Sequence, residues 1–283
     1  MLWKAPKSDK EPHWDAPFGQ GRPGWHLECS AMAMKQLGAT LDIHCGAVDN
    51  IFPHHDNEIA QSEAVTGKPF VRFWLHGEHL LVEGEKMSKS RGNFYTLRDL
   101  LERGYEPLAI RYALLSVPYR KQLNFTFDGL GQAASALNRI KDFLFRLRAA
   151  KLEAGSVASV AAAIVSARQA FEDGLDDDLN TAQALAAVFE LVRHCNIALS
   201  ESAIHEEDRT AILKWFETVD SRLAIVPPQE QADNSSEIDA LIAQRNQARR
   251  DRDFKTSDRI RGELTALGIL IEDTKDGTRW RRK

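Results

Sequence analysis

The sequence predicts a mixed α/β unit followed by an all-α part, and three features of the chain lead to this fold class. Strand and helix patterns alternate over the first 95 residues, as in a parallel doubly wound sheet. From residue 129 onward, apolar residues recur at intervals of three and four, which is the stripe of a helical bundle. Residues 225–236 contain two prolines and several polar residues without periodicity, which indicates a linker to a last segment.

The first unit, residues 1–95, is expected to hold about half of a doubly wound sheet. Gly38 is a natural stop for its first helix, because glycine accepts the left-handed backbone of a helix C-cap. Parallel strands need cover on both faces and neighbours at their edges, which this segment alone does not supply. The expected elements are a helix over 28–37, a strand over 40–45, a helix over 54–66, a strand over 70–76 and an extended segment near 78–82.

Capping residues mark several of the later helices. Thr96 with Asp99 three residues on predicts a helix start, and Asn180-Thr181 predicts another. Gly268 is a suitable stop for the last helix. The expected organisation is a connecting segment 96–128 with helices over 96–103 and 106–116, a bundle 129–224 with helices over 129–150, 157–173, 180–199 and 206–222, the linker 225–236, and a module 237–283 with helices over 237–250 and 255–267 and a strand over 269–273.

The composition is that of a globular protein from a reducing compartment. The 283 residues are 43% hydrophobic and 28% charged, and no apolar run approaches the roughly 18 residues that a membrane span needs. Cys29, Cys45 and Cys195 have no paired spacing, which argues against a disulfide framework. We therefore expect a soluble, cytoplasmic protein whose thiols are free to bind a metal, with no membrane partner.

Charge is unevenly distributed along the chain. The formal net charge is −4, yet residues 237–283 hold 12 Lys and Arg against 9 Asp and Glu. A solvated pair of charged helices is the ordinary explanation of such a segment, and on charge alone it is favoured over RNA binding.

Three side chains in the first unit could bind one metal ion. Cys29 offers a sulfur, His54 a nitrogen and Glu58 an oxygen, a donor set that suits Zn²⁺ better than Ca²⁺ or Mg²⁺. His54 and Glu58 are four residues apart, so on a helix that starts near Pro53 they lie side by side. Taken singly, a cysteine or histidine is more often buried packing. His55 points about 100° away from His54, which indicates a supporting role.

The sequence around these residues resembles that of one enzyme family. The segments RPGWHLECSAM at 22–32 and FPHHDNEIAQS at 52–62, with the pentapeptide KMSKS at 86–90, together resemble cysteinyl-tRNA synthetase, a class I aminoacyl-tRNA synthetase. The resemblance continues through LNFTFDGL at 123–130 and DDDLNTAQAL at 176–185 to the C-terminal residues. It covers essentially the whole chain.

The resemblance implies a fold and also a missing part. It identifies residues 1–95 with the second half of a Rossmann-like catalytic domain, 129–224 with a tRNA-binding bundle and 237–283 with an anticodon-binding module. The family's HIGH motif, whose histidines grip the ATP phosphates, does not occur in this sequence. We therefore expect the C-terminal portion of a synthetase, a monomer with little activity alone, for which an N-terminal HIGH-bearing half would be a partner.

The implied reaction is cysteine–tRNA ligation. Cysteine and ATP, carried with Mg²⁺, would give cysteinyl-adenylate and pyrophosphate, and cysteine would then pass to tRNA-Cys. One Zn²⁺ per chain would be held by Cys29, His54 and Glu58, with the fourth ligand in the missing half. Because zinc ligates a thiolate far better than a hydroxyl, the ion would select cysteine over serine.

The resemblance also assigns residues to the substrates. Trp25 and His44 would border the amino acid, and Gly46 and Asp49 the ATP, since a carboxylate can accept hydrogen bonds from ribose hydroxyls. The family has three glycines where this chain reads Cys45-Gly46-Ala47, so two side chains could narrow the adenosine pocket. In the KMSKS loop, the catalytic lysines Lys86 and Lys89 would stabilise the leaving pyrophosphate; the loop's residues expected to bind ATP are Lys86, Met87, Ser88, Lys89 and Ser90.

The last module is expected to contact the anticodon. Arg and Asp can bind base edges and an aromatic ring can stack on a base, and the resemblance places these roles on Arg249, Asp258, Asp273 and Trp280.

Other functions are also compatible with these residues. A non-catalytic tRNA- or zinc-binding paralogue is the main alternative. A cysteine ligase acting on a small amine is a further one, against which the basic tail argues, and a metal hydrolase would lack a general base. A narrower hypothesis makes Cys45 the fourth metal ligand, since it stands one residue beyond His44.

Overall fold

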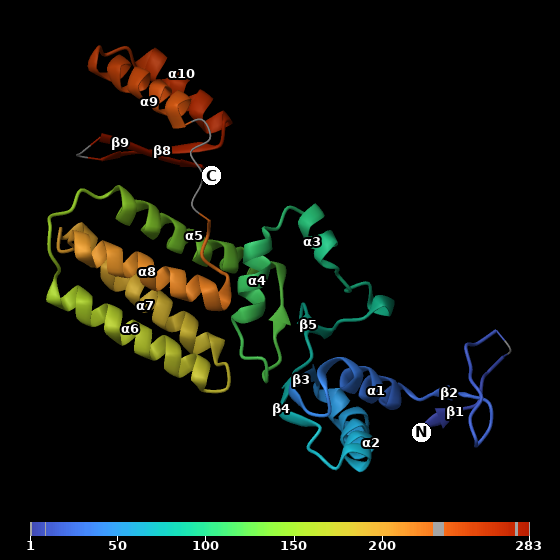
Figure 1. Ribbon diagram of the computed structural model, residues 1–283. Helices are drawn as coiled ribbons and strands as arrows, with labels where there is room; N and C mark the ends of the chain where they lie inside the picture. The colour runs from blue at the N-terminus through green and yellow to red at the C-terminus, as the bar shows by residue number, and fades with distance from the viewer. Residues whose placement is uncertain (1, 9, 229–234, 275–276, 283) are drawn as a thin grey trace. The chain divides into compact units, whose positions relative to one another are not determined.

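The computed structural model describes residues 2–8, 10–228, 235–274 and 277–282. Its elements confirm the predicted order of an α/β unit followed by helices (Figure 1). The chain divides into two compact units, Met1–Pro227 and Pro228–Lys283. Residues 229–234 of the predicted linker lie outside the described residues.

A two-stranded parallel sheet organises the first part of unit one. Strand β3 (Leu41–Ala47) pairs with β4 (Val71–Gly77), and Ile43 lies opposite Phe73. Helix α2 (Asp56–Thr66) forms the crossover between the strands, and α1 (Trp25–Leu37) packs beside it (Figure 1).

The two faces of this sheet have different surroundings. Side chains alternate between faces along a strand, so His44 and Trp74 lie on the face covered by the helices, with their rings 5.0 Å apart. Ile43 and Phe73 lie on the other face and are 59% and 66% exposed. The sheet therefore has one covered face and one open apolar face, as expected for part of a larger sheet.

The entry into both helices differs from the prediction. Helix α1 begins at Trp25 rather than residue 28, directly after Gly24 in extended conformation. Helix α2 follows a 3₁₀ turn, η1 (Val48–Asn50), and a π-helical turn, η2 (Ile51–His55). His54 thus belongs to a turn that runs into α2 without a break at His55.

Short strands that lack a sequence pattern form two further sheets. Strands β1 (Trp3–Lys4) and β2 (Arg22–Pro23) pair near the N-terminus. A three-stranded sheet has the order β6-β5-β7. Two residues are too few to show alternation, which is why these elements were not predicted beyond the segment near 78–82. Their bounds are β5 (Leu81–Val82), β6 (Glu85–Lys86) and β7 (Asn124–Phe125).

Helical periodicity located the remaining elements of this unit well. The capping box of Thr96 and Asp99 is present, and the Asn180 side chain accepts a hydrogen bond from the backbone N–H of Gln183, so both predicted caps are confirmed. The four long helices enclose one apolar core that includes the fully buried Phe143 and Trp215. The helices are α3 (Leu97–Glu102), α4 (Pro107–Leu115), α5 (Phe127–Ala149), α6 (Ala158–Asp176), α7 (Thr181–Ser200) and α8 (Glu206–Leu223).

The second unit is a helix pair packed on a hairpin. Ile242, Ile260 and Leu264 belong to its own small core. The predicted single strand has an antiparallel partner, which the sequence GTRWRR did not reveal because it holds one apolar residue. Its elements are α9 (Ser235–Arg250), α10 (Phe254–Ala266), β8 (Ile269–Thr274) and β9 (Gly277–Arg282). None of the helices described in either unit has the length and apolar character to cross a membrane.

Phe143→Ala is expected to lower the free energy of unfolding of the first unit by about 3–5 kcal/mol, because it removes a large buried ring from a packed core. Phe143 is 0% exposed, whereas Val165 on α6 is 69% exposed. Val165→Ala is the matched control and should change stability by about 0.5 kcal/mol or less. Urea denaturation followed by circular dichroism measures both, and equal small effects would contradict the assignment of the core.

Candidate functional site

The three predicted metal ligands come together at one place in the first unit. Cys29 lies on α1, His54 on η2 and Glu58 on α2, and one ligand atom from each lies within 4.8 Å of the other two. His54 Nε2 is 3.0 Å from Glu58 Oε1. Glu58 is 0% and His54 6% exposed, and Cys29 is half-buried.

The polar atoms of this group fit a bound cation. Glu58 Oε1 is buried and accepts no hydrogen bond, although His54 Nε2 lies 3.0 Å away at ion-pair distance. A buried carboxylate oxygen without a partner is costly, and a cation would satisfy it. Burial, followed by the nearby Glu58 carboxylate, raises the pKa of the Cys29 thiol, whereas a coordinated metal ion deprotonates such a thiol. Sulfur, nitrogen and oxygen donors together suit Zn²⁺.

Histidines surround the Glu58 carboxylate from two sides. His44 Nε2 on β3 lies 2.7 Å from Glu58 Oε2, so each oxygen of the carboxylate faces a different histidine. His26 Nδ1 and His54 Nδ1 are 2.7 Å apart in a second hydrogen bond. Trp25 stacks on the His54 ring, with centroids 4.1 Å apart, and remains 55% exposed. An open aromatic surface therefore adjoins the cluster.

His55 is the most enclosed of these histidines. It is 4% exposed, and its Nδ1 lies 2.7 Å from His76 Nε2. Burial, with a contribution from His44, lowers the pKa of His55 to about 4, so its ring is neutral at neutral pH. A Cβ on Gly46 would lie 2.6 Å from His55 Cε1. Glycine is therefore required at position 46 to admit the His55 ring.

Two sequence-based expectations for β3 and the following turn need separate comment. The hypothesis that Cys45 completes the metal site is wrong, because Cys45 is exposed and, as the neighbour of His44 on a strand, faces the opposite side of the sheet. Asp49, expected near ATP, has a side chain that is 66% exposed and lies 4.0 Å from His79 Nε2. It is not among the residues that converge on Glu58.

The KMSKS loop is an exposed turn held at its base. Lys86 ends the β5–β6 hairpin, and Lys89 begins a 3₁₀ turn that stops at Gly92, whose φ is +69°. Asn93 connects the two ends of the loop: its Oδ1 accepts from the Ser88 backbone N–H at 2.9 Å, and its Nδ2 donates to the Lys86 carbonyl at 3.2 Å. Both lysines are exposed. The loop thus presents two exposed lysines on a closed backbone, and Lys89 Nζ lies over the Phe94 ring at 5.5 Å from its centroid.

The predicted RNA contacts occupy the second unit. Arg249 Nη1 lies 2.5 Å from Asp273 Oδ2, and Asp273 also accepts two hydrogen bonds from the buried Arg245 guanidinium. Trp280 Nε1 donates to Asp239 Oδ1 at 2.8 Å. The structure therefore brings Arg249 and Asp273 together; the remaining expected residue, Asp258, is exposed on α10.

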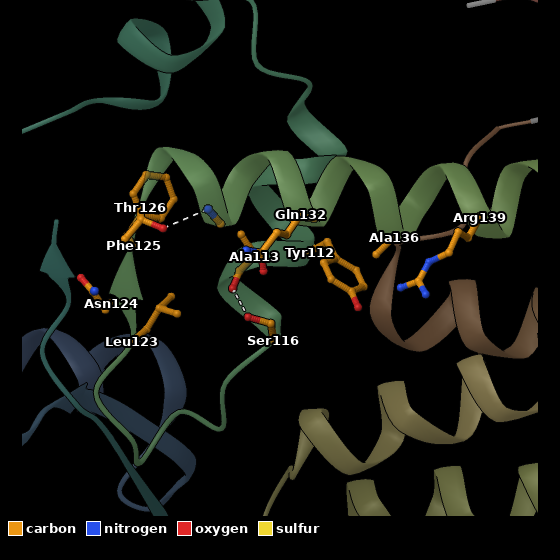
Figure 2. A pocket seen from close by; sticks show the side chains of 12 residues that line it. Tyr112, Ala113, Ser116, Leu123, Asn124, Phe125, Thr126, Gln132, Ala136 and Arg139 are labelled. Carbon is orange, nitrogen blue, oxygen red and sulfur yellow. Dashed lines mark hydrogen bonds between the residues drawn. The ribbon is translucent and has the colours of Figure 1, made fainter. Parts of the chain in front are cut away.

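A separate cavity of about 270 Å³ lies where α4, β7 and α5 meet (Figure 2). Tyr112, Ser116 and Thr126 line it, and Arg139 stands at its far end with its guanidinium carbon 4.8 Å from the centroid of the Phe189 ring. None of the residues that the sequence assigned to a site lines this cavity.

Comparison with known proteins decides the family. Three protein-family models match the chain. The "tRNA synthetases class I (C) catalytic domain" matches residues 1–135, the DALR domain matches residues 170–221, and the "Cysteinyl-tRNA ligase anticodon binding domain" matches residues 231–281. All of the chain aligns with the cysteine–tRNA ligase of Solibacter usitatus at 55% identity and with that of Koribacter versatilis at 45%. The chain belongs to the cysteine–tRNA ligase family.

The match covers only part of these relatives. The chain spans 61% of the Solibacter usitatus ligase and 63% of the Koribacter versatilis one. Among solved structures, the agnB2 LeuRS–tRNA–LeuAMS ternary complex of Agrobacterium radiobacter K84 is similar at a TM-score of 0.53 and 16% identity, over 70% of this chain and 31% of that one. This likeness supports the class I synthetase fold.

Three residues of this cysteine–tRNA ligase family member were not identified from its sequence. His76 is the last residue but one of β4 and His44 lies near the end of β3, and polar residues at the carboxyl ends of parallel strands are a usable signal. His26 directly follows Trp25, and only Trp25 was assigned a role from the sequence. Asn93 had no signal, because its two hydrogen bonds depend on the folded loop.

Asn93→Ala is expected to open the KMSKS loop, because it removes both hydrogen bonds that join the loop's ends. Amide hydrogen exchange of residues 86–92 should become several-fold faster, in keeping with a loss of about 1 kcal/mol per bond. Asn138→Ala, at an exposed position on α5, is the control and should leave this exchange unchanged. Unchanged exchange in Asn93→Ala would show that the side chain does not hold the loop.

Acid is expected to destabilise the second unit through Asp273. Hydrogen bonds from Arg245 hold the pKa of Asp273 well below its usual range. A carboxylate with a depressed folded-state pKa contributes its full stabilisation above its unfolded pKa of about 3.9, and this contribution decreases as the pH falls from there toward the folded-state pKa. Asp273→Asn should therefore lower the melting temperature more at pH 7 than near pH 2. Calorimetry measures this, with Glu272→Gln as the control, and an equal effect at both pH values would contradict it.

Proposed function

We propose that this chain is the part of a cysteine–tRNA ligase that carries the KMSKS loop, most of a zinc site and the tRNA-binding helices. The reaction is ATP-dependent activation of cysteine and its transfer to tRNA-Cys. The observation that carries the proposal is the convergence of Cys29, His54 and Glu58 at a buried carboxylate oxygen that has no hydrogen-bond partner. A donor set containing one thiolate is suited to an ion that selects a thiol substrate.

Each residue of the cluster has a distinct part in binding cysteine. Cys29, His54 and Glu58 would hold Zn²⁺, which when bound supplies a ligand position for the substrate sulfur. Trp25 stacks on His54 and is partly exposed, and its exposed surface would contact the short side chain of cysteine. His44 is held in place by its hydrogen bond to Glu58 at the edge of the same site.

The KMSKS loop provides positive charge for the adenylation step. Lys86 and Lys89 are exposed and could reach the ATP phosphates, where negative charge grows on the leaving pyrophosphate. Ser88 and Ser90, with Oγ atoms 3.3 Å apart, could donate further hydrogen bonds. ATP would arrive as its Mg²⁺ complex, since Mg²⁺ commonly binds through substrate phosphates.

The open face of the β3–β4 sheet indicates why activity should require another segment. Ile43 and Phe73 are exposed side by side on that face, and a parallel sheet is stable when both faces are covered. A HIGH-bearing segment, which the sequence described here does not contain, would cover it and bring the groups that grip ATP. We therefore propose that residues 1–283 alone support little adenylation.

The second unit is proposed to bind the anticodon. Trp280 offers a ring for stacking, and Arg249, Asp258 and Asp273 offer groups that can contact base edges. Because Arg249 and Asp273 already form an ion pair, base contacts there would exchange one polar partner for another. This keeps the charges satisfied in the free protein.

Cysteine-dependent ATP–pyrophosphate exchange tests the proposal. The chain alone should give almost no exchange, and exchange should appear when the remaining part of the Solibacter usitatus ligase is added as a second polypeptide. Lys89→Ala should lower the restored rate by on the order of 10², because it removes a preorganised charge, whereas Lys121→Ala should not.

Two outcomes would contradict the proposal. Strong exchange by the chain alone would refute the need for another segment. Persistent absence of exchange in the mixture, together with tight binding of tRNA-Cys, would favour a non-catalytic tRNA-binding paralogue instead.

A further inference from the structure

Arg245 on α9 is a buried arginine that contacts the predicted anticodon residues from inside the second unit. Its side chain is 4% exposed, whereas the side chains of Asp273 and Arg249 are 43% and 49% exposed. We propose that Arg245 is a positioning residue for anticodon recognition: it holds the Asp273 carboxylate and thereby leaves Arg249 available for a base of the RNA. This inference rests on the proposed function, in which the second unit binds the anticodon, and adds to it a residue that RNA does not touch.

The contact between Arg245 and Asp273 is bidentate. Arg245 Nη1 donates to Asp273 Oδ1 and Arg245 Nη2 donates to Asp273 Oδ2, each at 2.8 Å. Two parallel hydrogen bonds between a guanidinium and a carboxylate fix the carboxylate plane and are stronger than bonds between neutral groups. The Thr278 hydroxyl lies 2.8 Å from Asp273 Oδ1 and donates to it. Hydrogen bonds to Asp273, chiefly those from Arg245, hold its pKa well below the usual range, so this carboxylate is ionised at neutral pH.

Arg249 contacts the same carboxylate with a more exposed side chain and fewer hydrogen bonds. The two arginines are four residues apart on α9 and therefore lie on one face of the helix. Arg249 reaches Asp273 Oδ2 through Nη1 at 2.5 Å, and within the described residues its Nε and Nη2 form no hydrogen bond. A half-exposed ion pair with one contact is weaker than a bidentate pair to a buried guanidinium. Arg249 is therefore the partner that can leave Asp273 for RNA.

Charge explains why Arg245 matters for this exchange. Two guanidinium groups face one carboxylate, so the group carries one positive charge in excess. When Arg249 turns toward a base, Asp273 keeps its two hydrogen bonds from Arg245 and is not left without a counter-ion. Without Arg245, Arg249 would be the remaining ion-pair partner of Asp273 among the described residues, and the pair would have no net charge. A side chain that RNA cannot reach thus determines whether Arg249 can bind a base edge.

The alternative is that Arg245 serves only the stability of the second unit. In that case its replacement would weaken the binding of every RNA by the same factor, because it would change the fraction of folded protein. A positioning role predicts a different result. Contacts to base edges carry the sequence information and contacts to phosphates do not, so loss of Arg245 should change the preference among anticodon bases.

Binding of the full chain to four RNAs at one fixed salt concentration provides the test, with fluorescence anisotropy as the measurement. The RNAs are the tRNA-Cys transcript and three transcripts that each have one anticodon base replaced. Wild-type protein should prefer tRNA-Cys by about tenfold or more over at least one of these, as one arginine–base contact allows. Arg249→Ala should remove this preference, and Arg245→Met should lower it several-fold at the same anticodon position. Arg245→Lys keeps the charge without the bidentate geometry and should retain part of it.

Arg250→Met is the matched control. Arg250 is an exposed arginine on the same helix, and its Nε and Nη2 donate to Gln247 Oε1 rather than to Asp273. Its replacement removes one positive charge from α9 and leaves the Asp273 contacts in place. It should therefore weaken the binding of all four transcripts by the same factor and leave the preference unchanged.

The outcomes separate this inference from the proposed function. Wild-type protein that binds no tRNA-Cys, or binds all four transcripts equally, would refute the anticodon role of the second unit and this inference with it. A wild-type preference that persists in Arg249→Ala or in Arg245→Met would overturn this inference alone, as would equal weakening of all four transcripts in Arg245→Met. If circular dichroism shows that Arg245→Met is unfolded, Arg245→Lys decides: an unchanged preference in the folded variant overturns the inference, and a reduced preference supports it.

Discussion

The burial of the Glu58 carboxylate is the constraint on which the rest of the first α/β segment depends. A charged group with no exposed surface must be met by donors or cations. Helix α1, strand β3 and turn η2 each bring a side chain toward it, namely Cys29, His44 and His54. The packing of α1 and α2 on one face of the sheet is thus linked to the polar contacts of Glu58 between them. The opposite face of the sheet is exposed.

The sequence predicted those parts of the fold that are determined locally. Amphipathic periodicity located α5 to α8 within a few residues, and side-chain caps such as Thr96 and Asn180 marked where helices begin. Two-residue strands were missed because such short segments carry no period of their own, and β9 was missed because it holds a single apolar residue.

The candidate site was predictable to a similar extent. His54 and Glu58 were identified because four residues on a helix place them side by side, a purely local relation. The hydrogen bond between His55 and His76 joins residues 21 apart, so spacing alone could not reveal it. The assignment of Cys45 failed for a simpler reason: on a strand, proximity in sequence to His44 means orientation away from it.

Alternate residues of strand β3 face two different surfaces. Positions 44 and 46 contribute to the polar cluster, and positions 43 and 45 to the open face. Substitutions in one set leave the chemical surroundings of the other largely unaltered. A change at position 45 therefore alters the open face and leaves the polar cluster unaltered, so the two surfaces can vary independently along one strand.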